Sequence, residues 1–439
     1  MRTFQTRLSL ALFALLFCAT TAFGQGLTSA SINGRVVDTS GEPLIGANIL
    51  AVHTPSGSAY GNSTDLDGFY RIPGMRVGGP YTVTVSYTGY QDLVQENVYL
   101  QLGQSLKFDV ELSETAVTIE GVEVVAYRND VFDGNRTGAG TVVGEGQINS
   151  LPTVARAIGD FSRLTPQSTA REGGDGFVLS FNGMNNRYNS IYIDGAVNND
   201  VFGLAGSGTN GGQTGVSPIS VDAIEEFQIS LAPFDVRQGG FAGAAINAVT
   251  RSGTNNTEAS VYGFYRNQAL AGKTPTNDEN ADRTKLYDFS AYTTGFRVGG
   301  PIIKDKLFFF VNAELQRENT PLPFTGDYIG DSDDAAIGQL VSKLEGYGYD
   351  PGTYTDSERF LNSEKVTVKL DYNLNQNNKL SLRHGWVRAD NLEGVQSNPN
   401  RVRFLNSSER FLSNTNSTAL EWSSIIGSKM SNNLTLGYT

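Results

Sequence analysis

The feature that most constrains the fold is a series of amphipathic segments in residues 257–439, joined alternately by long polar stretches and very short connections. In Lys365–Leu374, apolar and polar side chains alternate: Val366, Val368, Leu370, Tyr372 and Leu374 fall on one face, and Lys365, Thr367, Lys369, Asp371 and Asn373 on the other. Successive side chains of a β-strand point to opposite faces, so this period of two predicts strands. A soluble antiparallel sheet shows the same alternation. The repetition of segments near the length that crosses a tilted bilayer favours a membrane β-barrel.

The lengths of the connections predict which side of the membrane each end of these strands faces. We predict strands at about 257–268, 286–300, 306–318, 362–374, 378–391, 413–427 and 430–439. Long connections (269–285, 319–361 and 392–412) alternate with short ones (301–305, 375–377 and 428–429). Outer-membrane barrels have short periplasmic turns and long external loops, so the short connections are expected to face the periplasm.

The segment Lys306–Glu318 contains one irregularity. Lipid-facing positions are predicted to be Leu307, Phe309, Val311, Ala313 and Leu315, and lumen-facing positions Asn312, Glu314, Gln316 and Glu318. Phe308 and Phe310 place aromatic rings on the lumen side of this pattern. We expect them to pack on a domain inside the barrel or at its periplasmic rim.

Composition excludes several classes of protein. The chain has 439 residues, room for two or three domains, and a net charge of −12 without any basic run, which disfavours nucleic acid as a partner. No stretch after residue 26 is apolar and long enough for a transmembrane helix. The two histidines, His53 and His384, lie far apart, and the G-x-G-x-x-G match at 206–211 lies in a polar run without a preceding apolar strand. We predict no catalytic residues, no metal, no cofactor and no enzymatic activity.

Residues 1–24 have the pattern of a secretory signal peptide. Arg2 and Arg7 precede the apolar stretch 8–19, and Ala22-Phe23-Gly24 is a small-x-small site that predicts cleavage between Gly24 and Gln25. A lipoprotein signal at Cys18, the only cysteine, is the alternative, and the bulky Phe17 disfavours it. Cleavage at Gly24 would leave no cysteine for a disulfide or a zinc site.

Residues 27–115 are predicted to form a small β-sandwich. Short alternating strands are expected at Ser31–Val37, Leu44–Val52, Phe69–Ile72, Tyr81–Tyr87 and Leu106–Leu112. Asp65–Gly68 could begin a calcium loop, but the twelfth position of an EF-hand would be Arg76, which favours an ordinary Asp-Gly turn.

Three stretches of this domain resemble the carboxypeptidase regulatory-like family: Ile32–Asp38, Gly41–Ile49 and Thr64–Tyr70. The resemblance implies a transthyretin-like sandwich that is an accessory domain without a peptidase site. Such domains commonly precede outer-membrane receptors of Bacteroidota-type bacteria.

The segment 119–127 resembles a TonB box, the stretch by which outer-membrane receptors engage the energy-transducing protein TonB. The resemblance implies TonB-binding residues Glu123, Val124, Val125, Ala126 and Tyr127. An extended segment can add to an exposed sheet edge through main-chain hydrogen bonds, which suits this role. An ordinary linker strand is the alternative.

Residues 128–250 resemble the α+β plug domain of TonB-dependent receptors. The resemblance rests on Phe181–Asn189, Ile193-Asp194-Gly195, Asn198-Asn199-Asp200 and Phe234–Asn247. The pattern predicts a helical segment at Ile158–Leu164, a strand at Glu226–Leu231 and a hairpin that pairs Phe177–Phe181 with Ser190–Asp194.

Gly299–Phe310 resembles the first periplasmic turn of Oar-like TonB-dependent receptors. The resemblance implies that 256–439 is the N-terminal part of a barrel of about 22 strands, since the sequence stops in mid-strand at Thr439. We therefore expect an N-terminal fragment of a longer protein.

The expected function is energy-coupled uptake of an unidentified ligand across the outer membrane, with the sandwich and the plug entrance on the periplasmic side. The implied partners are TonB with ExbB–ExbD, outer-membrane lipid and a surface lipoprotein. Adhesion or surface assembly on the same scaffold, and carbohydrate binding by the sandwich, are the alternatives.

Overall fold

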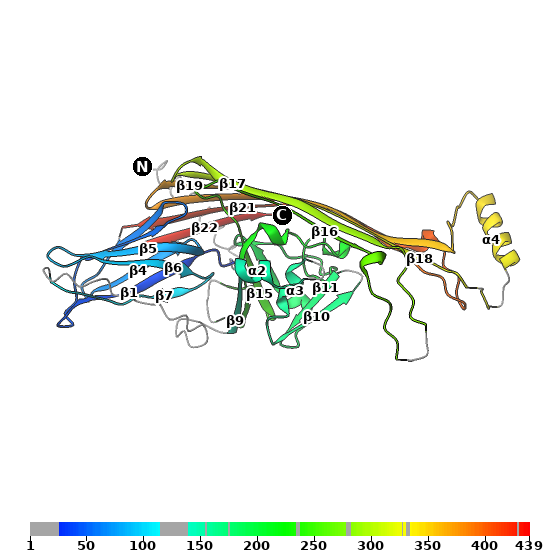
Figure 1. Ribbon diagram of the computed structural model, residues 1–439, viewed down its shortest axis with the longest axis horizontal. Coiled ribbons are helices and arrows are strands. Elements are labelled where there is room, and N and C mark those ends of the chain that lie inside the picture. The colour runs from blue at the N-terminus through cyan, green and yellow to red at the C-terminus, as the bar shows by residue number, and fades with distance from the viewer. Residues whose placement is uncertain are drawn as a thin grey trace, which may run out of the picture.

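The computed structural model describes residues 26–114, 139–153, 156–173, 176–233, 238–277, 282–326, 328–330, 334–427 and 430–439. A β-sandwich lies at one end of the molecule, a mixed unit at its middle, and an arched sheet extends over both (Figure 1). The long connections of that sheet and one helix lie at the other end (Figure 1). We call these units the sandwich, the plug and the wall. Among the described residues, no helix is long and apolar enough to cross a membrane.

The sandwich consists of two sheets, of strand order β4-β1-β7, with β8 also pairing with β1, and β3-β2-β5-β6. Its strands are β1 (Ala30–Asp38), β2 (Asn48–His53), β3 (Ser58–Ser63), β4 (Phe69–Met75), β5 (Gly78–Ser86), β6 (Leu93–Leu100), β7 (Ser105–Lys107) and β8 (Val110–Leu112). Alternate side chains of β1, β2 and β5 meet in the core, where Ile32, Ile49 and Val85 are fully buried. Four of the five expected strands are present, the fifth, Leu106–Leu112, is divided into β7 and β8, and β3 and β6 were not predicted. Asp65 forms the expected turn: its Oδ1 accepts hydrogen bonds from the N–H groups of Asp67 and Phe69.

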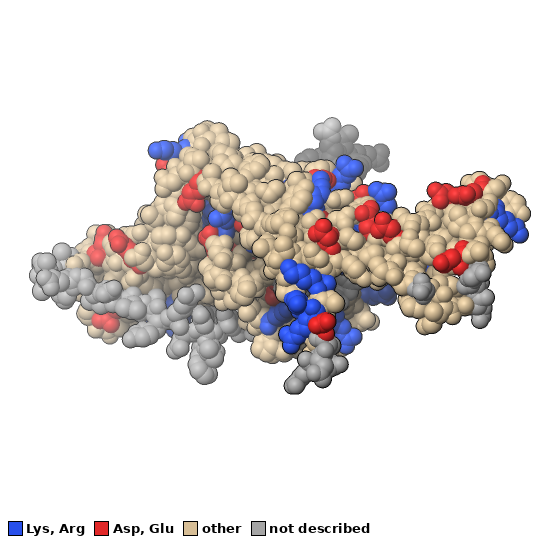
Figure 2. Space-filling view, turned by 45° about the vertical axis from the view of Figure 1, so that its right-hand side comes forward, with Lys and Arg blue, Asp and Glu red and all other residues tan. Residues whose placement is uncertain are grey.

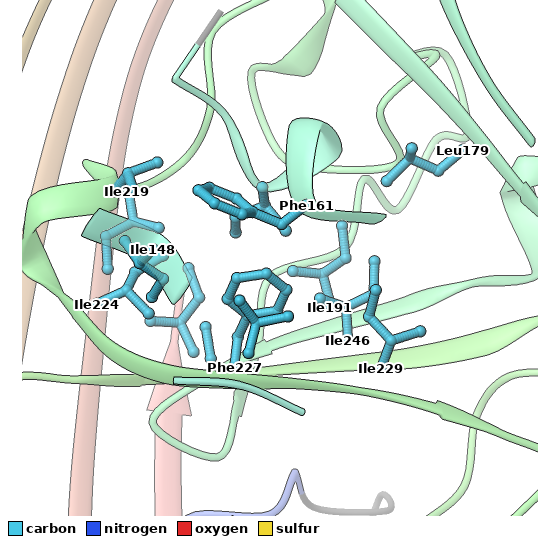
Figure 3. Close-up of a cluster of buried hydrophobic side chains, with 14 of the residues drawn as sticks. Ile148, Phe161, Leu179, Ile191, Ile219, Ile224, Phe227, Ile229 and Ile246 are labelled. Carbon is cyan, nitrogen blue, oxygen red and sulfur yellow. The ribbon is translucent and has the colours of Figure 1, made fainter. Parts of the chain in front are cut away.

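The plug contains a five-stranded sheet of order β13-β12-β15-β14-β9 and a separate hairpin β10-β11. Its strands are β9 (Ala139–Gly144), β10 (Ser168–Gly173), β11 (Gly176–Phe181), β12 (Ser190–Ile193), β13 (Ala196–Val197), β14 (Ile224–Leu231) and β15 (Ala244–Thr250). Its helices are α2 (Glu145–Ser150), α3 (Ile158–Ser162), η1 (Asn186–Tyr188), η2 (Gly212–Thr214) and η3 (Val221–Ala223). Isoleucines from several strands surround Phe161 and Phe227, whose ring centroids lie 5.5 Å apart (Figure 3).

One prediction within the plug is wrong. Phe177–Phe181 does not pair with Ser190–Asp194, because β11 pairs with β10 and β12 pairs in parallel with β15. The apolar pattern identified both strands, but their partners come from segments that the pattern did not connect. The helix at Ile158–Ser162 and the strand Ile224–Leu231 are confirmed.

The wall is one antiparallel sheet in which seven strands follow in chain order. They are β16 (Glu258–Asn267), β17 (Ser290–Ile303), β18 (Leu307–Pro323), β19 (Asp356–Asn375), β20 (Asn378–Glu393), β21 (Glu409–Ile426) and β22 (Met430–Tyr438). This confirms all seven predicted strands and the alternation of long and short connections. Two short helices, η4 (Gln268–Leu270) and η5 (Leu405–Ser407), and one longer helix, α4 (Asp334–Gly346), lie in the long connections.

The strands β18 and β19 are longer than predicted at the end of the long connections. β18 continues to Pro323, and Pro321 and Pro323 lie opposite Glu358 and Asp356 of β19. Prolines normally indicate that a strand has ended, since they donate no ladder hydrogen bond. For this reason the sequence pattern placed the end of the strand too early.

The two faces of the wall differ as predicted. Phe308, Phe310, Asn312 and Glu314 of β18 are buried toward the interior of the arch, and Phe310 belongs to the apolar core of the plug. On the outer face, Leu370, Tyr372 and Leu374 of β19 are each about 40% exposed. Figure 2 shows this outer surface as largely tan, with few charged side chains over much of the arched sheet. The expectation that Phe308 and Phe310 pack on an interior domain is confirmed.

Candidate functional site

The site residues predicted from sequence lie outside the described residues. This holds for Gly24 and Gln25 at the predicted cleavage site and for Glu123, Val124, Val125, Ala126 and Tyr127 in the predicted TonB box. The described chain stops at Glu114, just after β8, and resumes at Ala139, the first residue of β9. The predicted TonB box therefore lies between the last strand of the sandwich and the first strand of the plug.

The structure reveals a buried ionic contact between the plug and the wall, centred on Asp194. Its carboxylate lies 3.0 Å from Nε of Arg383 on β20 and 3.5 Å from Nζ of Lys369 on β19. All three side chains are less than 10% exposed. One carboxylate of the plug thus faces two cations from neighbouring strands of the wall.

A tight turn and two hydrogen bonds hold Asp194 in place. Asp194 and Gly195 connect β12 to β13, and both have positive φ, +46° and +76°, as a two-residue type I′ hairpin requires. The carboxylate also accepts hydrogen bonds from N and Oγ1 of Thr250, at 2.9 and 2.7 Å. Burial alone would raise the pKa of Asp194, but Lys369, Arg383 and the Thr250 hydrogen bonds hold that pKa below its usual range. The carboxylate is therefore charged when the plug is seated.

A second buried contact lies further along the wall. Glu314 of β18 accepts hydrogen bonds from Lys365 Nζ at 2.9 Å and from Ser220 Oγ of the plug at 2.7 Å. Tyr262 of β16 donates to the same carboxylate at 3.1 Å. Here the wall supplies the ion pair, and the plug adds one hydroxyl to it.

A third group of contacts lies near the first strands of the wall, and Arg156, Asp222 and Phe264 of this group line a cavity between plug and wall. Arg251 pairs with Glu145 at 2.7 Å, and Arg156 pairs with Asp222 while its guanidinium lies 4.0 Å from the ring centroid of Phe264. The cavity has a volume of about 510 Å³ and is lined by polar and apolar side chains of both units. Polar contacts are thus spread along the described plug and wall boundary.

These contacts join the plug to the wall by charge and hydrogen bonds. Within the described ranges, no group of three or more His, Cys, Asp or Glu side chains is placed to hold a metal ion. The Asp194 contact was not predicted, because an Asp-Gly pair after an apolar run is an ordinary hairpin signal. The inward-facing Lys369 was identified as polar, but its partner lies far away in sequence.

Two family models match this chain. A carboxypeptidase regulatory-like domain matches residues 31–113, which are the sandwich. An outer membrane beta barrel domain matches residues 249–336, which include β16 to β18.

Curated relatives match across the units. The TonB-dependent transporter Oar of Myxococcus xanthus is 28% identical over 307 residues, which cover 67% of this chain and 27% of Oar. The TonB-dependent receptor SusC of Bacteroides thetaiotaomicron is 35% identical over 117 residues, which cover 26% of this chain and 10% of SusC. The chain therefore spans about a quarter or less of the length of these relatives.

Solved structures of outer-membrane transporters are also similar. The transporter YddB from Escherichia coli aligns with a TM-score of 0.46 at 13% identity, over 68% of this chain and 38% of that chain. The ferric enterobactin receptor PfeA aligns with a TM-score of 0.46 at 16% identity, over 68% of this chain and 40% of that chain. The sequence relatives and the two family models agree with the wall and the sandwich: the chain is related to TonB-dependent receptors of the outer membrane and carries an N-terminal carboxypeptidase regulatory-like domain.

Proposed function

We propose that this receptor takes up a ligand across the outer membrane with energy supplied through TonB. In this proposal TonB binds Glu123–Tyr127, is powered by ExbB–ExbD, and pulls on the chain between the sandwich and the plug. The observation that carries the proposal is the buried Asp194 contact with Lys369 and Arg383. It joins the plug to two neighbouring strands of the wall through three charged groups.

The fold of the plug suits a pull from this segment. The first described strand after the predicted TonB box is β9, and it forms the edge of the plug sheet, with β14 as its neighbour in that sheet. An edge strand separates from one neighbour only, so its removal leaves the inner strands β14, β15 and β12 paired. A force on residues before Ala139 would therefore load the most easily detached strand first.

The contacts between the plug and the wall differ in kind from the contacts inside the plug. The interior is an apolar cluster of buried side chains, to which the wall adds Phe310, whereas Asp194 and Glu314 hold other parts of the boundary by charge and hydrogen bonds. Water that enters this boundary can replace those polar contacts, since exchange with water makes the net value of a hydrogen bond small. The plug can then shift with its own side chains still packed against one another, at the cost of the contact with Phe310.

The outer surface of the plug offers a place for a ligand to bind. In the loop after β13, Val201, Phe202 and Leu204 are 60–82% exposed. Asp200 shapes this loop by accepting a hydrogen bond from the N–H of Phe202 at 3.0 Å. We propose that this loop, together with the long connections of the wall, contacts the ligand.

The wall also supports a proposed orientation and a proposed partner. The short connections, with the sandwich beside them, are proposed to face the periplasm, and the long connections with α4 to face outward, where a surface lipoprotein would contact them. The relatives named above are a transporter and a receptor, and we propose that this chain likewise has no enzymatic activity. The structure favours neither alternative function, and the Tyr60 and Tyr70 rings, at 4% and 5% exposure, are not available to stack on a sugar.

Photo-crosslinking tests the TonB assignment without knowledge of the ligand. Tyr127 is replaced by a photoreactive phenylalanine analogue in the receptor expressed from its whole gene, and cells are irradiated. We expect a crosslinked species that contains TonB and is lost on Val124→Pro, because proline cannot donate the main-chain hydrogen bond of an added strand. Val124→Ala keeps that donor and is the matched control. Equal crosslinking in Val124→Pro and Val124→Ala would refute strand addition at this segment.

A further inference from the structure

The sandwich is docked onto the end of the wall where the short connections lie. Arg76, just after β4, donates from Nη1 to the carbonyl of Gly253 at 3.2 Å and from Nη2 to that of Ser252 at 3.3 Å. The backbone N–H of Asn255 donates to the carbonyl of Pro55 at 2.8 Å. Residues 251–257 connect the plug to the first wall strand, so the sandwich binds this connection directly.

The wall strands themselves also contact the sandwich. At the start of β20, Lys379 Nζ donates to the carbonyl of Ala59 at 3.0 Å and lies 3.8 Å from the ring centroid of Tyr60. At the end of β19, Asn373 donates to Ser58 Oγ at 2.8 Å. A cation over an aromatic ring is worth more when the pair is partly shielded from water, and here Tyr60 is buried and Lys379 half-buried.

The junction also has an apolar centre and a cavity. Val77 and Leu102 of the sandwich pack with Val249 of the plug, and all three are buried. Next to them, the backbone N–H of Leu102 donates to the Glu226 carboxylate. A cavity of about 110 Å³ lies where the three units meet, lined by charged side chains that include Arg76, Asp194, Lys369, Asp371, Lys379 and Glu421.

We propose that the sandwich is an intramolecular cap that holds the plug in its closed position and must undock before the plug can move. It binds the plug sheet at Glu226 and Val249, the plug-to-wall connection at Arg76, and the wall at Lys379 and Asn373. Any shift of the plug relative to the wall breaks one of these sets of contacts. The cap also lines the cavity that borders Asp194, so undocking would open the surroundings of the ionic contact further to water.

The position of the predicted TonB box also supplies a way to undock the sandwich from the plug and the wall. The box lies shortly after β8, the last strand of the cap, so a pull on it acts on the cap as well as on the plug. This part of the inference rests on the proposed function. The docking of the sandwich and its restraint of the plug are independent of that function.

A reversible disulfide tests the docking. A Cβ built on Gly74 of the sandwich lies 3.9 Å from Cβ of Ser423 on β21, close to the separation found in disulfides. The double variant Gly74→Cys/Ser423→Cys is produced from the whole gene and oxidised in isolated outer membranes. We expect most molecules to form the bond. Gly74→Cys/Glu409→Cys is the matched control, because Glu409 lies about 48 Å along β21 from Ser423, at about 3.4 Å per residue.

Urea-induced channel opening tests the effect on the plug. The purified double variant is placed in planar lipid bilayers, and urea is raised until the plug is displaced and ion conductance appears. We expect the oxidised form to open at a urea concentration about 1 M higher than the same preparation after reduction. The single variant Gly74→Cys carries the same backbone strain and should not respond to reductant. In the cysteine-free protein, Arg76→Glu/Lys379→Glu should open at a lower urea concentration than the parent.

The outcomes separate this inference from the proposed uptake. Equal urea thresholds for the oxidised and reduced forms would overturn the cap, as would failure of the disulfide to form in correctly inserted protein. The bilayer contains neither TonB nor ligand, so a threshold shift upholds the cap even where crosslinking of Tyr127 to TonB fails.

Discussion

Asp194 shows how a single side chain joins the plug to the wall. The carboxylate is held by the plug through Thr250 and faces Lys369 and Arg383 of the wall. Removing its charge would leave two buried cations without a counter-charge, and breaking a buried pair in this way costs about 3–5 kcal/mol.

We therefore predict that Asp194→Asn lowers the stability of the seated plug by about 3–5 kcal/mol, measured by urea unfolding of the whole receptor in detergent. Asp390→Asn is the matched control, since its partner Arg410 is 54% exposed. Loss of that surface pair should cost less than about 1 kcal/mol. Equal losses for the two variants would contradict the role given to Asp194.

His53 makes the sandwich sensitive to pH. The ring is buried at 3% exposure with Nδ1 2.7 Å from Ser56 Oγ, and burial followed by the nearby Arg76 charge lowers the pKa of His53 to about 3. The unfolded chain binds a proton near pH 6.5, so stability is lost as pH falls from about 6.5 toward 3. We predict a loss of about 2 kcal/mol between pH 7 and pH 5.

Hydrogen exchange of the β5 amides in the whole receptor, corrected for intrinsic rates, measures this loss. The variant His53→Gln has no ring to protonate, and its protection should change less over the same range. A β5 protection that stays constant from pH 7 to pH 5 in the parent would disprove the buried neutral histidine.

At the scale of elements, the alternation along β18 decides which side chains contact the plug. Phe310 lies in the apolar core of the plug, whereas its neighbour Phe309 points to the opposite face. We predict that Phe310→Ala destabilises the plug and wall contact by about 3–5 kcal/mol, as expected for truncation of a buried aromatic ring.

Phe309→Ala is the matched control on the adjacent residue, and its loss should be clearly smaller. Thermal unfolding of the purified receptor in detergent measures both variants. A larger loss for Phe309→Ala than for Phe310→Ala would mean that the strand faces are reversed.

Period-two patterning predicted the elements well and their partners less well. The seven wall strands and their order followed from alternation and connection length, because each strand pairs with the next in sequence. The parallel pairing of β12 with β15 joins segments about 55 residues apart, and nothing local specifies it. The helix α4 was missed inside a connection expected to be a loop, although Ile337, its one buried side chain, lies on its apolar face.

Site residues were harder to predict than elements. The inward position of Lys369 was clear from the sequence, but its pairing with Asp194 depends on how the plug sits in the arch. Arg76 and Lys379 are ordinary charged residues in the sequence, and only the docked arrangement gives them partners in another unit. Contacts between units are set by tertiary geometry, which local patterns do not encode.

At the scale of the whole molecule, the sandwich and the plug flank the segment on which TonB is proposed to pull, and the wall lies behind them. The predicted TonB box lies between the sandwich and β9, the plug fills the arch behind β9, and the wall anchors both. The proposed transport would use a plug that keeps most of its own apolar core while much of its boundary with the wall is polar. An adhesin on the same scaffold would have no use for this division.

Ligand accumulation that depends on TonB tests the central claim most directly. Cells expressing the receptor from its whole gene are grown in a complex medium, and mass spectrometry compares the compounds they accumulate with those of matched cells that lack TonB. We predict at least one compound whose accumulation requires the receptor, TonB and an intact Val124, and which Val124→Pro abolishes while the protein remains in the membrane. Accumulation that is unchanged without TonB, or no compound that depends on the receptor, would contradict the account.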